Sequence, residues 1–444
     1  MATQTKWSPL QSLHTALHQA RGNTDRLFDV VREDALYERP IPERHRIIFY
    51  IGHLEAFDWN LLRDHLFSLT SRTPEFDKLF AFGIDPVGGG LPTDKPDDWP
   101  SLPDVRQYVQ SLRTQIDDAL HARRFREAGI PEGYSPESLL HVAVEHRRMH
   151  AETLAYMLHQ LPHAKKIPQP QAAAAFSSSS SENPLMEISE GRVTLGLARG
   201  TGTNFGWDNE FEAITVSGPG FRINKYMVTN GEYLPFIEAE GYSRPEFWSA
   251  ADWEWKEQNA ICLPAFWKKS GARWLYRGMF EDIALPESWP VYVSHAEASA
   301  YARWSGQSLP TEAQWHRAAY GTPQGDERPH PWGSAEPSPS LGNFDFARWD
   351  AAPVNAYPAG KSAFGVEGLL GNGWEWTSTP FGPFPGFQPF AFYPGYSANF
   401  FDDNHFVIKG GSSRTAACLL RRSFRNWFQP HYQYVYAGFR CVCD

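Results

Sequence analysis

Two histidines and an acid lie close together at helical spacing: His146, His150 and Glu152. Four residues of an α-helix turn through about 400°, so the two imidazoles point in nearly the same direction, offset by about 40°. Two imidazoles on one side of a helix are able to hold one metal ion. The spacing therefore indicates a metal site. The alternative is a helix that is simply rich in histidine, because the same segment also contains His141 and His159.

The segment around these histidines, 138–161, has no proline or glycine before Pro162. Apolar and histidine side chains recur along one side of it with the period of an α-helix, which predicts that this side is buried. The side chains on that side are Val142, His146, Met149, His150, Thr153 and Met157.

A third metal ligand is expected from another apolar-periodic segment, 46–67, where His53 lies on the inner side. Its neighbours on that side are Phe49, Phe57 and Leu61. His45 and His65 are weaker candidates, because they lie nearer the ends of the same segment.

Four long helical patterns precede residue 165, at 9–36, 42–69, 103–124 and 136–161. Four helices with modest connections predict an antiparallel bundle that positions the histidines. The connection 80–103 is longer and rich in Gly, Pro and Asp, so it cannot be helical. Loops of this length in compact domains are usually functional or mobile.

Composition excludes several classes of protein. The 444 residues carry a net charge of -10, and their Lys and Arg residues are scattered, which argues against a nucleic-acid surface. No apolar run is long enough to span a membrane and the first residues lack a signal-peptide core, so we expect a cytoplasmic protein. The four cysteines have neither a zinc-ribbon spacing nor that of a disulfide framework. Small-molecule partners remain, and the oligomeric state cannot be read.

A tract rich in Pro, Ala and Ser, 164–185, predicts a linker between a first domain, 1–163, and a second, 186–444. The second domain has short β-like runs between Gly and Pro residues, with helices expected at 295–304 and 311–319. Aromatic residues make up 15% of the chain and concentrate after residue 200, which is typical of a loop-rich α+β fold.

Six short motifs of the second domain, in this order, resemble the formylglycine-generating-enzyme fold, a variant of the C-type lectin fold. The resemblance covers nearly all of 186–444, and it predicts a multidomain protein of α and α+β class. The motifs are Lys225–Tyr233, Trp289–His295, Leu309–Trp315, Gly371–Thr377, Lys409–Ser412 and Ala437–Arg440.

The first domain resembles the DinB-type four-helix bundle, whose three-histidine metal site is matched by His53, His146 and His150. In this order the two domains resemble the ergothioneine-biosynthesis sulfoxide synthases and their relatives, the selenoneine synthases. The resemblance implies a non-haem iron(II) enzyme that uses oxygen to attach sulfur or selenium to the imidazole of hercynine, Nα-trimethylhistidine. Glu152 is expected to orient a ligand or a backbone group rather than to bind the metal, with a solvated acid on the helix face as the alternative, and Met149 is expected beside the ligands.

Hercynine carries a trimethylammonium that cannot donate a hydrogen bond, so aromatic faces should recognise it. In the family an Asn-Trp segment lies at the active site, which assigns Asn426, Trp427 and Phe428 to hercynine. Trp374 and Trp376 are expected to belong mainly to the core, as in this fold generally.

The chain departs from the enzymes that use γ-glutamylcysteine. Met149 stands where they often have a glutamine, and the region 80–103 lacks the arginines that clamp the two carboxylates of that donor. An acidic loop favours free cysteine or an uncharged donor such as a selenosugar, with γ-glutamylcysteine as the alternative. The donor-binding candidates are Asp85, Asp94, Arg422 and Arg425.

The family is expected to use a tyrosine near the iron, but the run 380–387 has Phe where a Tyr would be expected. Tyr393 and Tyr396 are the possible substitutes.

Three other functions share some of these sequence features. A zinc-dependent thiol transferase would use the same three histidines. A copper-dependent formylglycine generator would need a cysteine pair near the Gly-Gly-Ser motif, where only Cys418 occurs. A non-catalytic lectin-like module would bind no iron and consume no oxygen.

Overall fold

The protein divides into two compact units in the computed structural model, Met1–Gln169 and Pro170–Asp444. The structure describes residues 9–81, 90–125, 130–131, 134–170, 182–200 and 205–443. Residues 171–181 of the predicted linker lie outside these ranges, so the boundaries at 163 and 186 stay predictions. Within the described ranges, no helix combines the length and apolarity needed to cross a bilayer.

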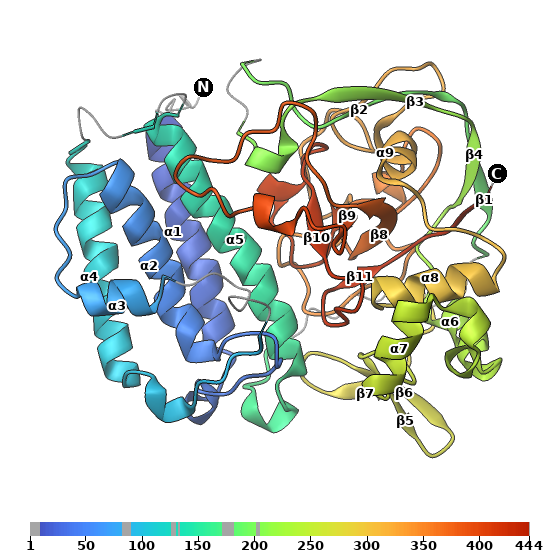
Figure 1. Ribbon diagram of the computed structural model, residues 1–444, viewed down its shortest axis with the longest axis horizontal. Coiled ribbons are helices and arrows are strands. Elements are labelled where there is room, and N and C mark those ends of the chain that lie inside the picture. The colour runs from blue at the N-terminus through green and yellow to red at the C-terminus, as the bar shows by residue number, and fades with distance from the viewer. Residues whose placement is uncertain are drawn as a thin grey trace. The chain divides into compact units, whose positions relative to one another are not determined.

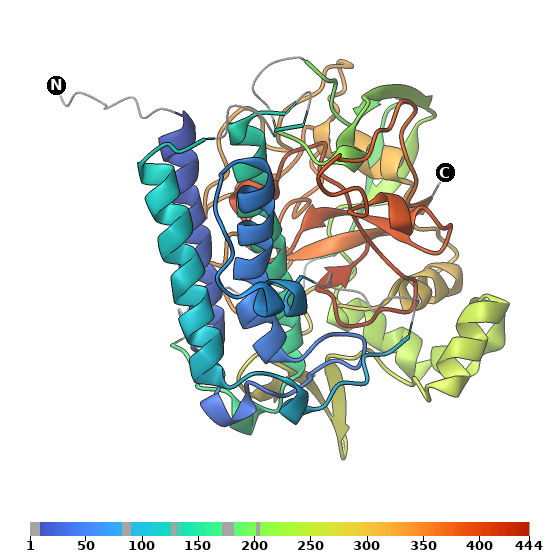
Figure 2. The same cartoon turned by 60° about the vertical axis from the view of Figure 1, so that its left-hand side comes forward.

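The first unit is built on four long helices that run side by side, as Figures 1 and 2 show in blue to teal. A short fifth helix, α3, lies between the second and third of them. The helices are α1 (Pro9–Phe28), α2 (Ile47–His65), α3 (Pro74–Leu79), α4 (Leu102–His121) and α5 (Pro136–Gln160).

Helix ends differ from the sequence-based expectations mainly before α2. Helix α1 ends at Phe28 instead of residue 36, and the chain then forms an isolated bridge between Val31 and Lys166. Helix α2 begins at Ile47 instead of residue 42, and the backbone N–H groups of Ile47 and Ile48 donate to the carbonyls of Glu38 and Leu36 in the preceding segment.

Serine caps set the starts of α4 and α5. The Ser101 hydroxyl accepts from the backbone N–H of Asp104, and the Ser135 hydroxyl accepts from that of Ser138. A proline follows in the first turn of each helix, where its missing N–H costs nothing. These caps fix where the histidine-bearing helix α5 begins.

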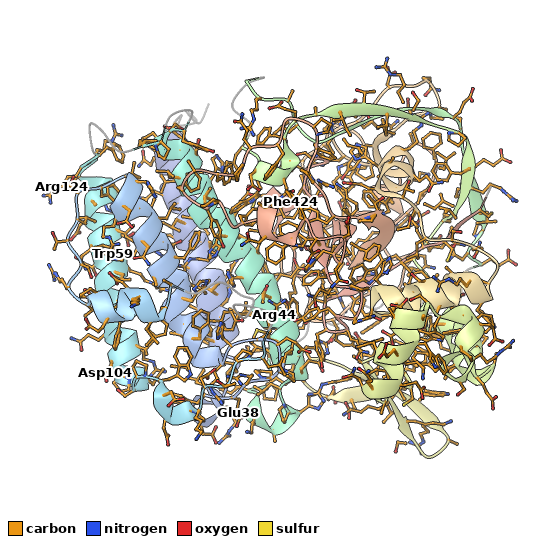
Figure 3. The ribbon with its side chains drawn as sticks, viewed as in Figure 1. Glu38, Arg44, Trp59, Asp104, Arg124 and Phe424 are labelled. Atoms are coloured by element: carbon orange, nitrogen blue, oxygen red, sulfur yellow. The ribbon has the colours of Figure 1, made fainter. Side chains whose placement is uncertain are left out.

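Polar contacts attach α3 to α2 and α4. The Nε1 of Trp59, labelled in Figure 3, donates to one carboxylate oxygen of Asp77 at 2.9 Å. The hydroxyl of Tyr108 donates to the other at 2.8 Å. This attachment holds the end of α3, including Phe80, against the middle of α2.

The described part of the second unit combines four short α-helices with small sheets. Helices at 295–304 and 311–319 were expected and are present, the second one shifted by one residue. Two others were missed, because α6 contains Pro235 and α7 has no continuous apolar side. The helices are α6 (Asn230–Glu238), α7 (Ala250–Gln258), α8 (His295–Trp304) and α9 (Glu312–Tyr320).

The strands of the second unit form sheets with the orders β10-β9-β8-β11, β1-β4-β12, β5-β6-β7 and β2-β3. Pairing is antiparallel except between β8 and β11. The strands are β1 (Leu185–Ile188), β2 (Gly191–Leu195), β3 (Ile214–Gly218), β4 (Phe221–Asn224), β5 (Trp267–Ser270), β6 (Arg273–Arg277), β7 (Asp282–Ala284), β8 (Gly373–Pro380), β9 (Phe406–Gly411), β10 (Asn426–Phe428), β11 (Ala437–Gly438) and β12 (Val442–Cys443).

A fully buried ion pair lies in the core of this unit. Arg440 donates to both carboxylate oxygens of Glu375, at 2.6 and 2.7 Å, and the indole N–H of Trp315 donates to the same carboxylate at 2.9 Å. Trp374 and Trp376 of β8 are also buried, as the sequence predicted for core residues. The family motifs thus contribute largely to the core of the second unit.

Candidate metal centre

Three histidines converge inside the helical bundle. His53 lies on α2, and His146 and His150 lie one turn apart on α5. One donor atom from each lies within 4.8 Å of the other two, and the side chains are only 2%, 4% and 1% exposed. The structure thus brings together the three residues that the sequence singled out.

Burial keeps these imidazoles neutral. Desolvation lowers the pKa of His53 to about 4 and lowers the pKa values of His146 and His150 well below the usual range. A neutral imidazole retains the lone pair that a metal ion needs, whereas an imidazolium would repel the ion. The cluster therefore has the protonation state of a ligand set near neutral pH.

A backbone carbonyl fixes the orientation of His53. Its Nδ1 lies 2.8 Å from the carbonyl oxygen of Phe80, and because a carbonyl can only accept, Nδ1 carries the proton. The Nε2 atom of His53 and both ring nitrogens of His150 are buried and have no hydrogen-bond partner in the described part of the chain. Buried polar atoms without partners are costly, and a metal ion would bind Nε2 of His53 and one of the two nitrogens of His150.

Aromatic rings pack on two of the ligands. Phe57 stacks on His146 with ring centroids 3.4 Å apart, and Phe49 stacks on His53 at 4.8 Å. These contacts restrict rotation of the imidazoles and surround the site with apolar surface.

A buried ionic network joins the two ligand-bearing helices directly beside the histidines. Arg147 of α5 donates to Glu55 at 3.0 Å, to the carbonyl of Leu54 at 2.9 Å and to Asp58 at 2.5 Å. Arg113 of α4 donates to Glu55 at 2.8 Å. Each of these contacts on α2 lies within five residues of His53, so the network sets the distance between the ligand helices.

The arginines keep the carboxylate of Glu55 ionised, whereas burial raises the pKa of the neighbouring Asp58. Burial alone would raise the pKa of the Glu55 carboxyl as well, but Arg147, Arg113 and Arg21 lower it to about 2. Sequence reasoning missed this network. Its signal was the charged Arg147 in the apolar segment beside His146, together with Glu55 and Asp58 beside His53.

The two residues expected near the metal ligands, Glu152 and Met149, lie on α5. Glu152 is 6% exposed and Met149 is half-buried, with its carbonyl accepting from the Thr153 hydroxyl at 3.2 Å. Their roles around a metal stay predictions.

The residues predicted to bind hercynine lie on β10 of the second unit, but they do not share one face. Successive side chains of a strand alternate, so Trp427 points away from Asn426 and Phe428. Accordingly, Trp427 stacks on Phe381 with centroids 4.1 Å apart, whereas Phe428 stacks on Tyr432 at 5.3 Å. One ligand group is thus able to meet Trp427 or Phe428 but not both rings at once.

One of the two candidate tyrosines lies beside Trp427. The ring of Tyr396 stands edge-on to Trp427 at 5.5 Å and stacks on Trp207 at 4.1 Å. Tyr393 lies next to Tyr396, with ring centroids 5.6 Å apart. The structure therefore groups Tyr396 with the predicted hercynine contact more directly than Tyr393.

Asp94, a predicted donor contact, is bound by arginines from outside its loop. The Nε of Arg46 and the indole N–H of Trp99 each donate to its carboxylate at 2.8 Å, and Arg39 binds it as well. The two arginines, which precede α2, thus offset part of the acidic charge of this loop. The expectation of free cysteine or an uncharged donor relied on that charge. Asp85 lies outside the described residues.

The two arginines proposed for donor binding have partners within their own unit. Arg425 is 3% exposed and donates to Glu312 at 3.0 and 3.1 Å, while Arg422 pairs with Glu327 at 3.2 Å. Arg425 therefore has a structural contact already, and Arg422 is the more accessible of the two. Their assignment to the donor stays a prediction.

The contact between Phe80 and His53 depends on a glycine. A Cβ on Gly52 would lie 2.5 Å from the ring of Phe80, closer than real carbon contacts allow. Gly52→Ala should therefore displace Phe80 and weaken its hydrogen bond to His53, although alanine favours the helix by up to about 1 kcal/mol. We expect at least tenfold weaker metal binding with the bundle still folded, measured by metal titration and circular dichroism. As a control, Gly22→Ala on α1 meets no atom within 4 Å and should leave metal affinity unchanged.

Comparison with known proteins finds a matching family for each of the two units. Residues 172–444 match the sulfatase-modifying factor enzyme 1-like domain, and residues 16–154 match the DinB superfamily. These matches confirm the predicted fold class and the order of the two domains.

Curated proteins are similar to this chain over half or more of its length. The chain is 37% identical over 357 residues to a hercynine oxygenase of Mycolicibacterium smegmatis, covering 78% of this chain and 79% of the relative. It is 42% identical over 239 residues to that of Mycobacterium tuberculosis, covering 53% of this chain and 56% of the relative.

A fungal relative extends the similarity to nearly the whole chain. The ergothioneine biosynthesis protein 1 of Neurospora crassa is 28% identical over 497 residues, covering 93% of this chain but 55% of the relative. The chain thus spans only about half of the mycobacterial (M. tuberculosis) and fungal proteins. The two domain matches, and the similarity over most of the M. smegmatis protein, show that the chain belongs to the ergothioneine-biosynthesis sulfoxide synthase family, which includes the hercynine oxygenases.

Proposed function

We propose that this protein is a non-haem iron(II) oxygenase that couples a sulfur or selenium donor to the imidazole carbon of hercynine. The observation that carries the proposal is the convergence of three buried, neutral imidazoles within 4.8 Å of one another. The names of the relatives supply the substrate class, since the mycobacterial proteins are hercynine oxygenases.

His53, His146 and His150 would hold the ion, with Nε2 as the ligand atom of His53 because its Nδ1 is bonded to Phe80. An iron(II) ion bound by three nitrogen ligands supplies redox chemistry and leaves coordination positions open for oxygen and substrate. The rings of Phe57 and Phe49 keep two ligands in place and keep water from them. Zinc is the rival ion, because it accepts the same ligand set.

The trimethylammonium of hercynine would meet the aromatic group around Trp427. This side chain is half-buried, with Phe381, Tyr396 and Phe400 packed around it at 4.1 to 5.5 Å. Aromatic faces attract a cation that cannot be hydrogen-bonded. We propose the Tyr396 hydroxyl as the proton or electron source, since it comes from the same group.

Free cysteine or a selenosugar is the proposed donor, with γ-glutamylcysteine as the alternative. The absence of Arg from 80–103 favours free cysteine or a selenosugar. The binding of Asp94 by Arg39 and Arg46 favours the alternative, because it places two guanidinium groups at this loop. The donor therefore has to be decided by experiment.

Metal-free protein should be loaded anaerobically with iron(II) and then given air, hercynine and one donor at a time. The donors are cysteine, γ-glutamylcysteine, a 1-thio sugar and a 1-seleno sugar, and mass spectrometry identifies the product. We expect a hercynine adduct with cysteine or a sugar donor. Coupling to γ-glutamylcysteine alone would support the alternative, and no adduct with any donor would contradict the proposed function.

His146→Ala should reduce bound iron from about one equivalent to less than about 0.1 and abolish coupling, because two imidazoles remain from a set of three. His141→Ala is the matched control, since it removes a half-buried histidine of the same helix that is outside the cluster. Iron content should be measured by atomic spectroscopy and helicity by circular dichroism. Full iron content in the folded His146→Ala protein would disprove the ligand assignment.

A further inference from the structure

A second group of metal-binding side chains lies between α1 and α4, apart from the three-histidine centre. His14 and His18 occupy adjacent turns of α1, and Asp117 lies on α4. One donor atom of each lies within 4.8 Å of the other two. Unlike the buried centre, this group is accessible, with side-chain exposures of 15% for His14, 50% for His18 and 22% for Asp117.

The distances within the group fit a small divalent ion. The Nε2 atoms of His14 and His18 are 3.0 Å apart, and they lie 3.6 and 3.8 Å from the two carboxylate oxygens of Asp117. A tetrahedral zinc ion with bonds of about 2.0–2.1 Å separates its ligand atoms by about 3.3–3.4 Å. The distance of 3.0 Å between the two Nε2 atoms and the 3.8 Å from His18 to Oδ2 lie on either side of this value. The 3.6 Å distance from His14 is to the other oxygen, Oδ1, so the ring of His14 has to shift as well if Oδ2 is the ligand atom of Asp117.

The surroundings prepare the group to bind a cation. Burial and the neighbouring His18 lower the pKa of His14, which keeps its imidazole neutral. Arg21 donates to Oδ1 of Asp117 at 2.7 Å, which orients the carboxylate and leaves Oδ2 toward His18. Arg21 itself is compensated by Glu55 at 3.8 Å.

A further histidine supports the arrangement. The Nδ1 of His121 donates to the carbonyl of Asp117 at 2.7 Å, and its ring packs edge-on against His14 with centroids 4.7 Å apart. These contacts restrict the ring of His14 and the last turn of α4, as supporting contacts commonly do around metal ligands.

We propose that His14, His18 and Asp117 form a second divalent-metal site, suited to zinc, that connects α1 to α4 and is independent of the proposed catalytic iron. His and carboxylate ligands suit zinc, and water would complete the coordination on the exposed side. The ion would replace the contact between two imidazole nitrogens with bonds that join two helices. Its role is to stabilise the bundle. It neither requires nor affects the choice of the sulfur or selenium donor.

The test is a zinc titration of metal-free, full-length protein, with stoichiometry measured against a chromophoric chelator. The wild type should bind two equivalents. His18→Ala should bind one, His146→Ala should bind one, and the double variant should bind none. His18 is half-exposed, so its replacement should not unfold the bundle.

Asp117→Asn should lower the affinity for the second zinc equivalent at least tenfold. Asp118→Asn is its matched control, because it makes the same charge change at the adjacent, exposed position of α4. Zinc should also raise the melting temperature of His146→Ala, in which only the proposed site remains. A single equivalent in the wild type, or two equivalents of unchanged affinity in His18→Ala, would overturn the proposal.

Discussion

Replacing Arg147 with methionine is expected to lower the unfolding free energy by about 3–5 kcal/mol, the usual cost of removing one partner from a buried ion pair. Arg147 is 1% exposed and is bound to Glu55 and Asp58, which are both fully buried. Without it, the buried Asp58 loses its guanidinium partner, and the pKa of Asp58, which burial already raises, should rise further. Because the same side chain joins α5 to α2, iron binding should weaken together with stability. Urea unfolding and iron titration measure the two effects.

Two further variants test this explanation. Arg148→Met changes the neighbouring, half-buried arginine of α5 and should cost less than about 1 kcal/mol. Combining Arg147→Met with Asp58→Leu removes both charges, so it should recover part of the lost stability. If Arg147→Met unfolded at the wild-type urea concentration, the network would not stabilise the bundle.

Trp427→Ala is expected to raise the KM for hercynine about thirtyfold, since a cation–π contact in a desolvated site contributes about 2 kcal/mol. Phe381 and Tyr396 would lose a packing partner at the same time. Iron content should not change, because the ligands lie in the other unit. Steady-state oxygen consumption at varied hercynine concentration measures the effect.

The alternation of side chains along β10 provides the control. Phe428 lies on the opposite face of the strand from Trp427, so Phe428→Ala should change the KM for hercynine by less than about threefold. Histidine lacks the trimethylammonium, so its weaker binding should be nearly the same in wild type and Trp427→Ala. A larger effect of Phe428→Ala would place hercynine on the other face.

The sequence predicted the helices and the three histidines well, because both depend on local periodicity. The pairing of His53 with His146 needed only the expectation that two apolar sides face each other. The Arg147 network was missed, since its partners are about 90 residues away and an arginine on the buried side of a helix does not reveal what neutralises it.

Long-range contacts also limited the prediction of the donor site. The loop 80–103 is acidic in its own residues, yet Arg39 and Arg46 reach Asp94 from before α2. Likewise, the three residues assigned to hercynine are consecutive in sequence, whereas strand geometry places Trp427 on the opposite face from its neighbours. Local sequence tells which residues occur. The net charge of a site, and the direction in which its side chains point, depend on the segments that pack against it.

The buried pair of Arg440 and Glu375 has a consequence for the order of events during synthesis. Arg440 neutralises Glu375 and also donates to the carbonyls of Asn224 and Lys225, more than 200 residues earlier in the chain. Strands β11 and β12, on either side of Arg440, complete two different sheets. While this segment is still inside the ribosome, Arg440 is not available to neutralise Glu375, so burying that carboxylate would be costly. The two sheets that contain β11 and β12 can therefore be completed only after Arg440 has emerged.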